Sequence, residues 1–144
     1  MGRLLAIDFG KVRCGIAATD SLQIVANPLA TVETPRLEAF LRDYFAREEV
    51  EAVVIGLPRQ MDGSPSESQR YLRPALGRLR KAFPGMRFEL YDERFTSVLA
   101  HRAMLDGGMR KMQRRQKEPV DRMAACIILN DFLSSRQNGF SPTN

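Results

Sequence analysis

The stretch LLAIDFG, residues 4–10, ends an apolar run on an acid and a glycine, and RCGIAAT, residues 13–19, resumes the run three residues later. Apolar runs this short, bounded by turn residues, are typical of buried strands. A third run at Pro28–Val32 lies close behind them. The three runs, joined by short connections, predict a meander of three antiparallel strands.

Downstream of this meander, strands alternate with helices. Thr34 and Pro35 predict a helix start, with Thr34 as N-cap and Pro35 in the first helical position. The further predicted elements are a β-branched strand at Ala52–Ile55, a helix over about 66–82 that contains Pro74, a strand at Arg87–Tyr91, a short helix from Thr96 or Ser97 to about Leu105, and a last helix from Pro119 to about Ser134. This order predicts an α/β domain, a mixed five-stranded sheet with helices on both faces. We expect one domain over residues 1–134 and a frayed or disordered tail over 135–144.

The composition narrows the class of protein. Apolar residues make up 44% of the 144 residues and charged residues 27%, as in ordinary globular domains. We find no membrane-spanning run and no signal peptide, so we expect a cytoplasmic protein. Cys14 and Cys126 lack metal-binding spacing and are expected to be free buried thiols. The net charge of +5 favours polyanionic partners.

The last predicted helix places an acid on an apolar stripe. Ala124, Ala125, Ile128 and Phe132 follow Asp121 at i+3, i+4, i+7 and i+11, the spacing of one helical face. A carboxylate on a buried face is costly unless it is paired or binds a metal ion. Asp121 is therefore a candidate metal ligand, and the plainer interpretation is an acid that stabilises the first helical turn.

Acids also end two of the predicted strands. Asp8 closes the first strand and projects into the region where open α/β sheets bind ligands, although a turn-forming aspartate beside a glycine is the plainer interpretation. Asp92 and Glu93 close the fifth strand. Successive strand residues point to opposite faces, so only one of these two acids can face the site. Strand geometry alone does not choose between them.

Three carboxylates at one edge of a sheet predict a hard, oxygen-ligated cation, Mg²⁺ or Mn²⁺. Such an ion activates water and stabilises an in-line displacement at phosphorus. The single histidine, His101, has no nucleophile in its sequence context and is interpreted as structural or as a phosphate contact.

A basic segment directly precedes the last helix. Met109–Lys117 carries five basic residues and no acid: Arg110, Lys111, Arg114, Arg115 and Lys117. A charge run of this kind is often only a solvated face. Its place beside Asp121 favours the alternative that it grips phosphates next to the cleaved bond, together with Arg13 and Arg94.

These motifs together resemble a known family. The matching segments are Ala6-Ile7-Asp8-Phe9-Gly10 with Arg13, Gly15 and Ala17; Val54-Ile55-Gly56-Leu57-Pro58 with Asp62-Gly63; Asp92-Glu93-Arg94-Phe95-Thr96-Ser97; and Asp121-Arg122-Met123-Ala124-Ala125 with Ile128-Leu129. In this order and spacing they resemble the YqgF family, also described as RuvC-like or Holliday-junction-resolvase-like and as pre-16S rRNA nucleases, within the RNase H-like superfamily. The resemblance runs from Leu4 to about Leu133.

The resemblance implies an RNase H-like fold and a metal-dependent nuclease that matures the 5′ end of small-subunit ribosomal RNA. It places the family's carboxylates on Asp8, Glu93 and Asp121, and it favours Glu93 over Asp92. Resolvases of this superfamily usually carry an acid at the end of the fourth strand. Here that strand ends Gly56-Leu57-Pro58, so the metal cluster must be assembled differently.

Other functions remain as alternatives. A Holliday junction resolvase acting on branched DNA would need a dimer with two sites. A non-catalytic assembly factor would bind structured nucleic acid, with association to a ribosomal subunit. The Asp8-x-Gly10 pattern also resembles the first phosphate loop of actin-like ATPases, but those proteins need two domains, which 144 residues do not supply.

Overall fold

The computed structural model describes residues 2–57, 69–92 and 117–137, with side chains at 117–121 and 137 outside the description. Its strands are β1 (Arg3–Asp8), β2 (Arg13–Thr19), β3 (Ala26–Glu33), β4 (Val50–Leu57) and β5 (Arg87–Asp92), and its helices are the 3₁₀ turn η1 (Thr34–Arg36), α1 (Leu37–Arg47), α2 (Gln69–Ala82) and α4 (Lys117–Gln137). None of the described helices is long and apolar enough to span a membrane.

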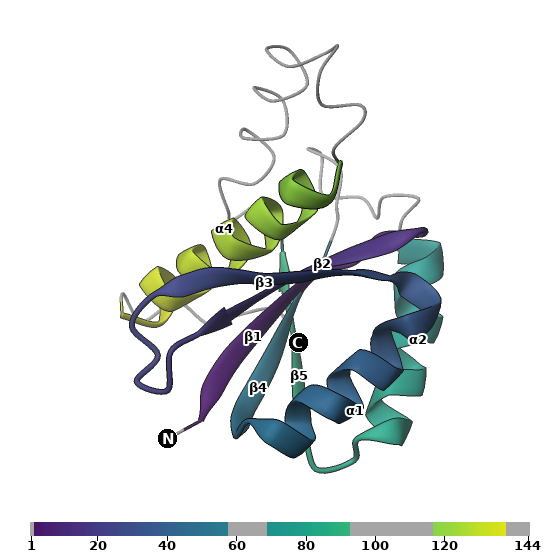
Figure 1. Cartoon of the computed structure of the whole chain (residues 1–144), viewed down its shortest axis with the longest axis horizontal. Coiled ribbons are helices and arrows are strands. Elements are labelled where there is room, and N and C mark those ends of the chain that lie inside the picture. Colours follow the sequence, from purple (N-terminus) through teal and green to yellow (C-terminus); the bar gives the residue numbers. More distant parts are fainter. Residues whose placement is uncertain (1, 58–68, 93–116, 138–144) are drawn as a thin grey trace.

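The five strands form one sheet in the order β3-β2-β1-β4-β5. Strands β1, β2 and β3 pair antiparallel, whereas β4 pairs parallel with both β1 and β5. The predicted mixed sheet, an antiparallel meander followed by parallel strands, is therefore confirmed. Because β1, β4 and β5 run the same way, their carboxyl ends meet at one edge of the sheet (Figure 1).

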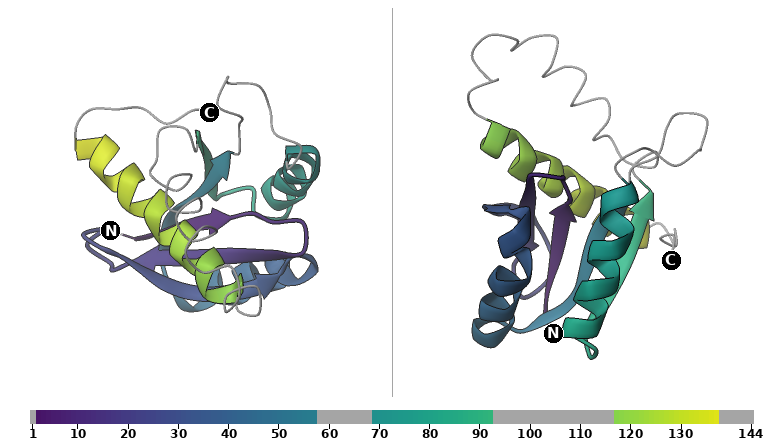
Figure 2. Two further views of the ribbon diagram at one scale, coloured as in Figure 1. Left: turned by 90° about the horizontal axis from the view of Figure 1, so that it is seen from above. Right: turned by 90° about the vertical axis from the view of Figure 1, so that its right-hand side faces the viewer.

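Helices cover both faces of the sheet, as predicted (Figures 1 and 2). Helices α1 and α2 bury Leu41, Leu72 and Leu76 against one face. Helix α4 buries Ala125 and Ile128 against the other face, mainly over β1, β2 and β3. This layering decides which strand residues can share a site, because alternate residues of each strand belong to different layers.

The start of α1 differs from the prediction. Thr34 is not the N-cap of an α-helix: residues Thr34–Arg36 form η1, and no side chain caps it or α1. The Thr34 hydroxyl instead donates a hydrogen bond to the Gly10 carbonyl, at 2.7 Å. The Thr34 side chain therefore bonds to the loop between β1 and β2 instead of capping the helix. Helix α1 begins only at Leu37.

Helix α4 is longer than predicted, beginning two residues before Pro119 and ending at Gln137 rather than at about Ser134. The predicted tail beyond residue 137, and the predicted helix at 96–105, lie outside the described residues. Both cysteines are free, as expected; Cys14 is buried and Cys126 half-buried. Burial raises the pKa of the Cys126 thiol, which favours the protonated form.

Candidate active site

Asp8 is the last residue of β1 and is 9% exposed. Leu4 and Ala6 of the same strand pack against α4, so strand alternation places Asp8 on the α4 face of the sheet. A carboxylate buried at the carboxyl end of a central strand is poorly hydrated, and it needs a partner or a cation. Asp8 therefore lies where the sequence predicted a metal ligand.

Glycines occupy the neighbouring position on each side of Asp8. Gly15 of β2 pairs directly with Asp8. On the other side Ile7 lies level with Ile55, and continuing this parallel register by one residue brings Asp8 level with Gly56 of β4. Neither neighbouring strand therefore has a side chain next to the Asp8 carboxylate on the α4 face. We call Asp8, Gly15 and Gly56 the glycine notch.

Tyr91 of β5 is level with Gly56 and bounds the notch on the far side. Its ring is fully buried and meets the Phe132 ring edge-on, with the centroids 5.7 Å apart. The Tyr91 hydroxyl is hydrogen-bonded to the Ser135 hydroxyl, which donates to the Asp131 carbonyl at 2.8 Å. Tyr91 is therefore the donor to Ser135, and the pair ties β5 to α4.

Asp92 lies on the opposite face from Asp8. Phe88 and Leu90, which precede it by four and two residues, pack in the layer of α1 and α2. Alternation places Asp92 in that same layer, and its side chain is 2% exposed. The sheet therefore separates the Asp8 and Asp92 carboxylates.

The direction of α4 brings its first turns toward the Asp8 edge. At its other end, Asn130 accepts a hydrogen bond from the Ala26 amide at 3.3 Å, and Arg136 donates to Gln23 at 3.4 Å. Ala26 pairs with Thr19, whose hydroxyl accepts from the Leu4 amide at 2.9 Å, so this end lies at the start of β1.

Residue 121 precedes Asn130 by nine helical positions, or about 13 Å along α4. Helix α4 covers the face of the sheet on which Asp8 lies, so the backbone at Asp121 belongs to that same face.

The loop after Asp8 is tightly held. A Cβ atom added at Gly10 would lie 2.3 Å from the Arg13 carbonyl oxygen, so the turn requires glycine. Besides the bond from the Thr34 hydroxyl to Gly10, the Thr34 amide donates to the Val12 carbonyl at 2.9 Å. These contacts fix the chain that joins Asp8 to Arg13.

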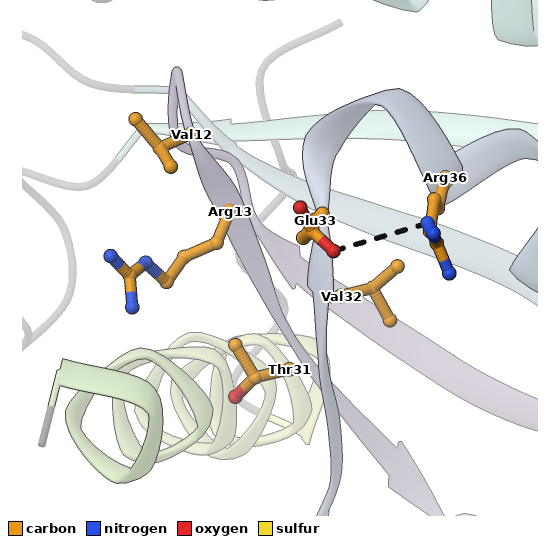
Figure 3. Close-up of a pocket in the computed structure, with 6 residues that line it drawn as sticks. All are labelled: Val12, Arg13, Thr31, Val32, Glu33 and Arg36. Carbon is orange, nitrogen blue, oxygen red and sulfur yellow. Dashed lines mark ion pairs between the residues drawn. The ribbon is translucent and has the colours of Figure 1, made fainter.

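Arg13 borders a shallow pocket of about 460 Å³ at the ends of β2 and β3 (Figure 3). The residues that line it are Val12, Arg13, Thr31, Val32, Glu33 and Arg36. Glu33 pairs with Arg36 at 3.9 Å. Arg13 and Thr31 project on the α4 side, whereas Val32 lies on the other side of the strand (Figure 3). Arg13 thus lies on the face that carries Asp8, at the same edge.

The other predicted site residues are only partly placed. Lys117 and Asp121 lie in α4, with their side chains outside the description. Those that lie outside the described residues altogether are Glu93, Arg94, His101, Arg110, Lys111, Arg114 and Arg115. Within the described part of the chain no three acidic, histidine or cysteine side chains group together as metal ligands would.

The sequence predictions missed the roles of two glycines. Gly15 and Gly56 belong to the motifs that carried the family resemblance, but neither was assigned a function. Their roles follow from the pairing of β1 with both β2 and β4, because only that register places the two glycines beside Asp8.

Known proteins match nearly the whole chain. The family described as "RuvX: Holliday junction resolvase" matches residues 2–135. A relative from Phocaeicola vulgatus, described as "Putative pre-16S rRNA nuclease", is 50% identical over 137 residues, which cover 95% of this chain and 99% of that protein. A relative from Parabacteroides distasonis with the same description is 47% identical over 137 residues, 95% of this chain and 98% of that protein.

Solved structures share the fold. The structure of T. thermophilus RuvC in complex with a Holliday junction substrate superposes with a TM-score of 0.60 at 20% identity, and covers 99% of this chain and 99% of that one. A second Thermus thermophilus RuvC structure gives a TM-score of 0.60 at 18% identity, over 97% of this chain and 99% of that one. The fold is therefore RNase H-like.

Proposed function

Because this chain belongs to the RuvX family, it is a nuclease that hydrolyses phosphodiester bonds, and we propose that its substrate is the precursor of 16S ribosomal RNA. The observation that carries the site assignment is the buried Asp8 carboxylate at the end of β1, inside the glycine notch. The RNA substrate is supported by the shared description of the two relatives, each about half identical to this chain.

Mg²⁺ or Mn²⁺ is the proposed cofactor, with Asp8, Glu93 and Asp121 as ligands. The donors suit a hard cation because carboxylate oxygens are its preferred protein ligands. The strand neighbours of Asp8 are also compatible with a bound cation, since Gly15 and Gly56 add no side chain next to its carboxylate. A bound divalent cation would supply Lewis-acid chemistry, polarising the phosphodiester and favouring ionisation of the attacking water.

Glu93 is a better ligand candidate than Asp92. The Asp92 side chain lies in the α1 and α2 layer, opposite Asp8, and is almost fully buried there. The family resemblance places the second carboxylate on Glu93. We therefore keep Glu93 in the proposed triad and assign Asp92 a structural role.

Basic side chains would hold the substrate. Arg13 is on the face and edge that carry Asp8, where it can bind a phosphate next to the cleaved bond. The remaining proposed contacts are Arg94, Arg110, Lys111, Arg114, Arg115 and Lys117. These residues would bind and orient the substrate backbone, and Asp8 would help to hold the cation.

Junction resolution is the second candidate function. The family description names a Holliday junction resolvase, and the RuvC structure of the same fold was solved with such a junction. That activity would require a homodimer with two sites. The RNA function instead favours association with a ribosomal subunit and a cytoplasmic location, where the precursor is processed.

Cleavage assays on two substrates separate these functions. A labelled 16S precursor leader and a four-way DNA junction are incubated with the protein in Mg²⁺, Mn²⁺ or EDTA. We expect metal-dependent cuts in the leader. Paired symmetric cuts confined to the DNA junction would instead indicate that the protein resolves Holliday junctions. Tight binding of the leader with no cleavage in any metal would contradict the nuclease proposal and favour an assembly factor.

A further inference from the structure

Helix α2 is strongly basic. Its fourteen residues include no acid and five basic residues, which are Arg70, Arg73, Arg78, Arg80 and Lys81. The formal charge of +5 on α2 equals the formal net charge of the whole chain. The neighbouring helix α1 carries two basic and two acidic residues, so its charges cancel. The cationic character on this side of the sheet is therefore concentrated on α2.

The basic side chains of α2 face outward. Leu72, Ala75, Leu76 and Leu79 form its buried stripe against the sheet, and all five basic residues are exposed. Arg70 and Lys81 lie eleven positions apart on nearly the same line of the helix, a separation of about 16 Å. Pro74 and Gly77 lie between them with little side chain to cover the surface. The exposed face of α2 is thus a cationic track along one helix.

Neutral groups bind two of these cations. Arg73 donates to the Gln69 side chain at 3.0 Å, and Arg80 donates to the Phe88 carbonyl at 3.2 Å. These contacts orient the guanidinium groups without cancelling their charge. On α1, in contrast, Arg42 pairs with Glu38 and Arg47 with Asp43, at 3.3 and 3.1 Å.

The track begins beside the proposed active site. The Lys11 ammonium lies 4.9 Å from the centre of the Tyr71 ring, in the first turns of α2. Lys11 belongs to the loop that joins Asp8 to Arg13, and this loop is fixed by Thr34. Tyr71 is itself partly exposed. Cationic and aromatic groups therefore continue over the sheet edge, from the Asp8 side onto α2.

We propose that the exposed face of α2 binds the phosphate backbone of the RNA that flanks the cleavage point. This inference rests on the nuclease function and RNA substrate proposed above. Exposed arginine and lysine side chains bind phosphates with release of counterions, so the affinity that they contribute falls as the salt concentration rises. The contacts would carry no sequence information, and would position the substrate on the edge where it is cut.

A matched pair of variants tests the track. Arg78→Gln/Lys81→Gln removes two charges from α2, and Arg42→Gln/Arg47→Gln removes two charges from α1, on the same side of the sheet (Figure 2). Fluorescence anisotropy with the precursor leader in EDTA measures binding between 50 and 200 mM KCl, and circular dichroism verifies folding of each variant.

We expect the α2 variant to bind at least about tenfold more weakly and to lower the slope of log affinity against log salt by about 2. The α1 variant should keep the wild-type slope. A leader trimmed to the few nucleotides around the cut should be cleaved at equal rates by wild type and the α2 variant.

Equal slopes for the two folded variants would overturn the α2 proposal, even where the wild type cleaves the leader. Failure of the wild type to cleave would instead overturn the nuclease proposal. The comparison of the α1 and α2 variants measures binding in EDTA, so it does not depend on whether the wild type cleaves the leader.

Discussion

At the residue scale, the site depends as much on missing side chains as on present ones. Asp8 is buried at the strand end, and the two strand neighbours that could crowd it are glycines. The resemblance implies an acid at the end of the fourth strand in related resolvases, where this chain has Gly56-Leu57-Pro58.

We therefore expect Gly56→Ala to impair catalysis more than folding. The added methyl group would enter the notch and displace the cation or the phosphate, and a displacement of about 1 Å can cost about 100-fold in rate. The control is Gly85→Ala, where an added Cβ meets nothing within 4 Å. Cleavage rates and urea unfolding of both variants are measured. A Gly56→Ala protein with the wild-type rate would show that the notch is not needed.

Asp20 makes a pH-dependent contribution to the β2–β3 turn. Its carboxylate accepts hydrogen bonds from the Leu22, Ile24 and Val25 amides, each at 3.0 Å, and Gln23 between them has a φ of 58°. These backbone bonds, that of Val25 first, lower the pKa of Asp20 below its ordinary value of 3.8. A carboxyl with a lowered pKa stabilises the fold above its unfolded pKa, and this stabilisation is lost as the pH falls through the folded value.

Urea midpoints of wild type and Asp20→Ala, measured from pH 7 to pH 2, test this contribution. The wild type should have the higher midpoint at neutral pH, and the difference should close below pH 3.8. A difference that persists unchanged at pH 2 would assign the effect to something other than the carboxylate.

At the element scale, α4 joins the fold to the site. Its buried stripe holds it across β1, β2 and β3, and its direction brings the first turns to the Asp8 edge. Any loss of packing along the stripe should therefore affect both stability and the placement of Asp121.

Ile128→Ala measures this packing. The Ile128 side chain is fully buried, so its truncation should lower the free energy of unfolding by about 2–5 kcal/mol. Met123→Ala, on the exposed side of the same helix, should change it by less than about 0.5 kcal/mol. Equal losses from the two substitutions in urea titrations would contradict the observed orientation of α4.

Much of the order of strands and helices was predictable because the apolar residues recur at the spacings of strands and helices. Short apolar runs gave the strands, and the stripe from Ala124 to Phe132 gave the buried face of α4, which the structure confirms. The cap at Thr34 was wrong because a tertiary hydrogen bond to Gly10 is invisible in local sequence. The roles of Gly15 and Gly56 needed the strand pairing, which the sequence pattern does not determine.

At the scale of the whole molecule, the sheet edge organises the chemistry. Parallel β1, β4 and β5 end together, the glycine notch opens on the α4 face, and the cationic face of α2 begins across the same edge beside Lys11. Under the two proposals, a single domain would hold the reacting phosphate on one side of the edge and the flanking RNA backbone on the other.

Asp8 and Asp92 give the most direct test of the metal site, because both are buried acids at strand ends on opposite faces of the sheet. Asp8→Asn and Asp92→Asn are compared for Mg²⁺-dependent cleavage of the precursor leader, with folding verified by circular dichroism. We expect Asp8→Asn to lose at least about 100-fold in rate and Asp92→Asn, when folded, to retain Mg²⁺-dependent cleavage. Undiminished cleavage by Asp8→Asn would contradict the assignment of Asp8 as the principal metal ligand.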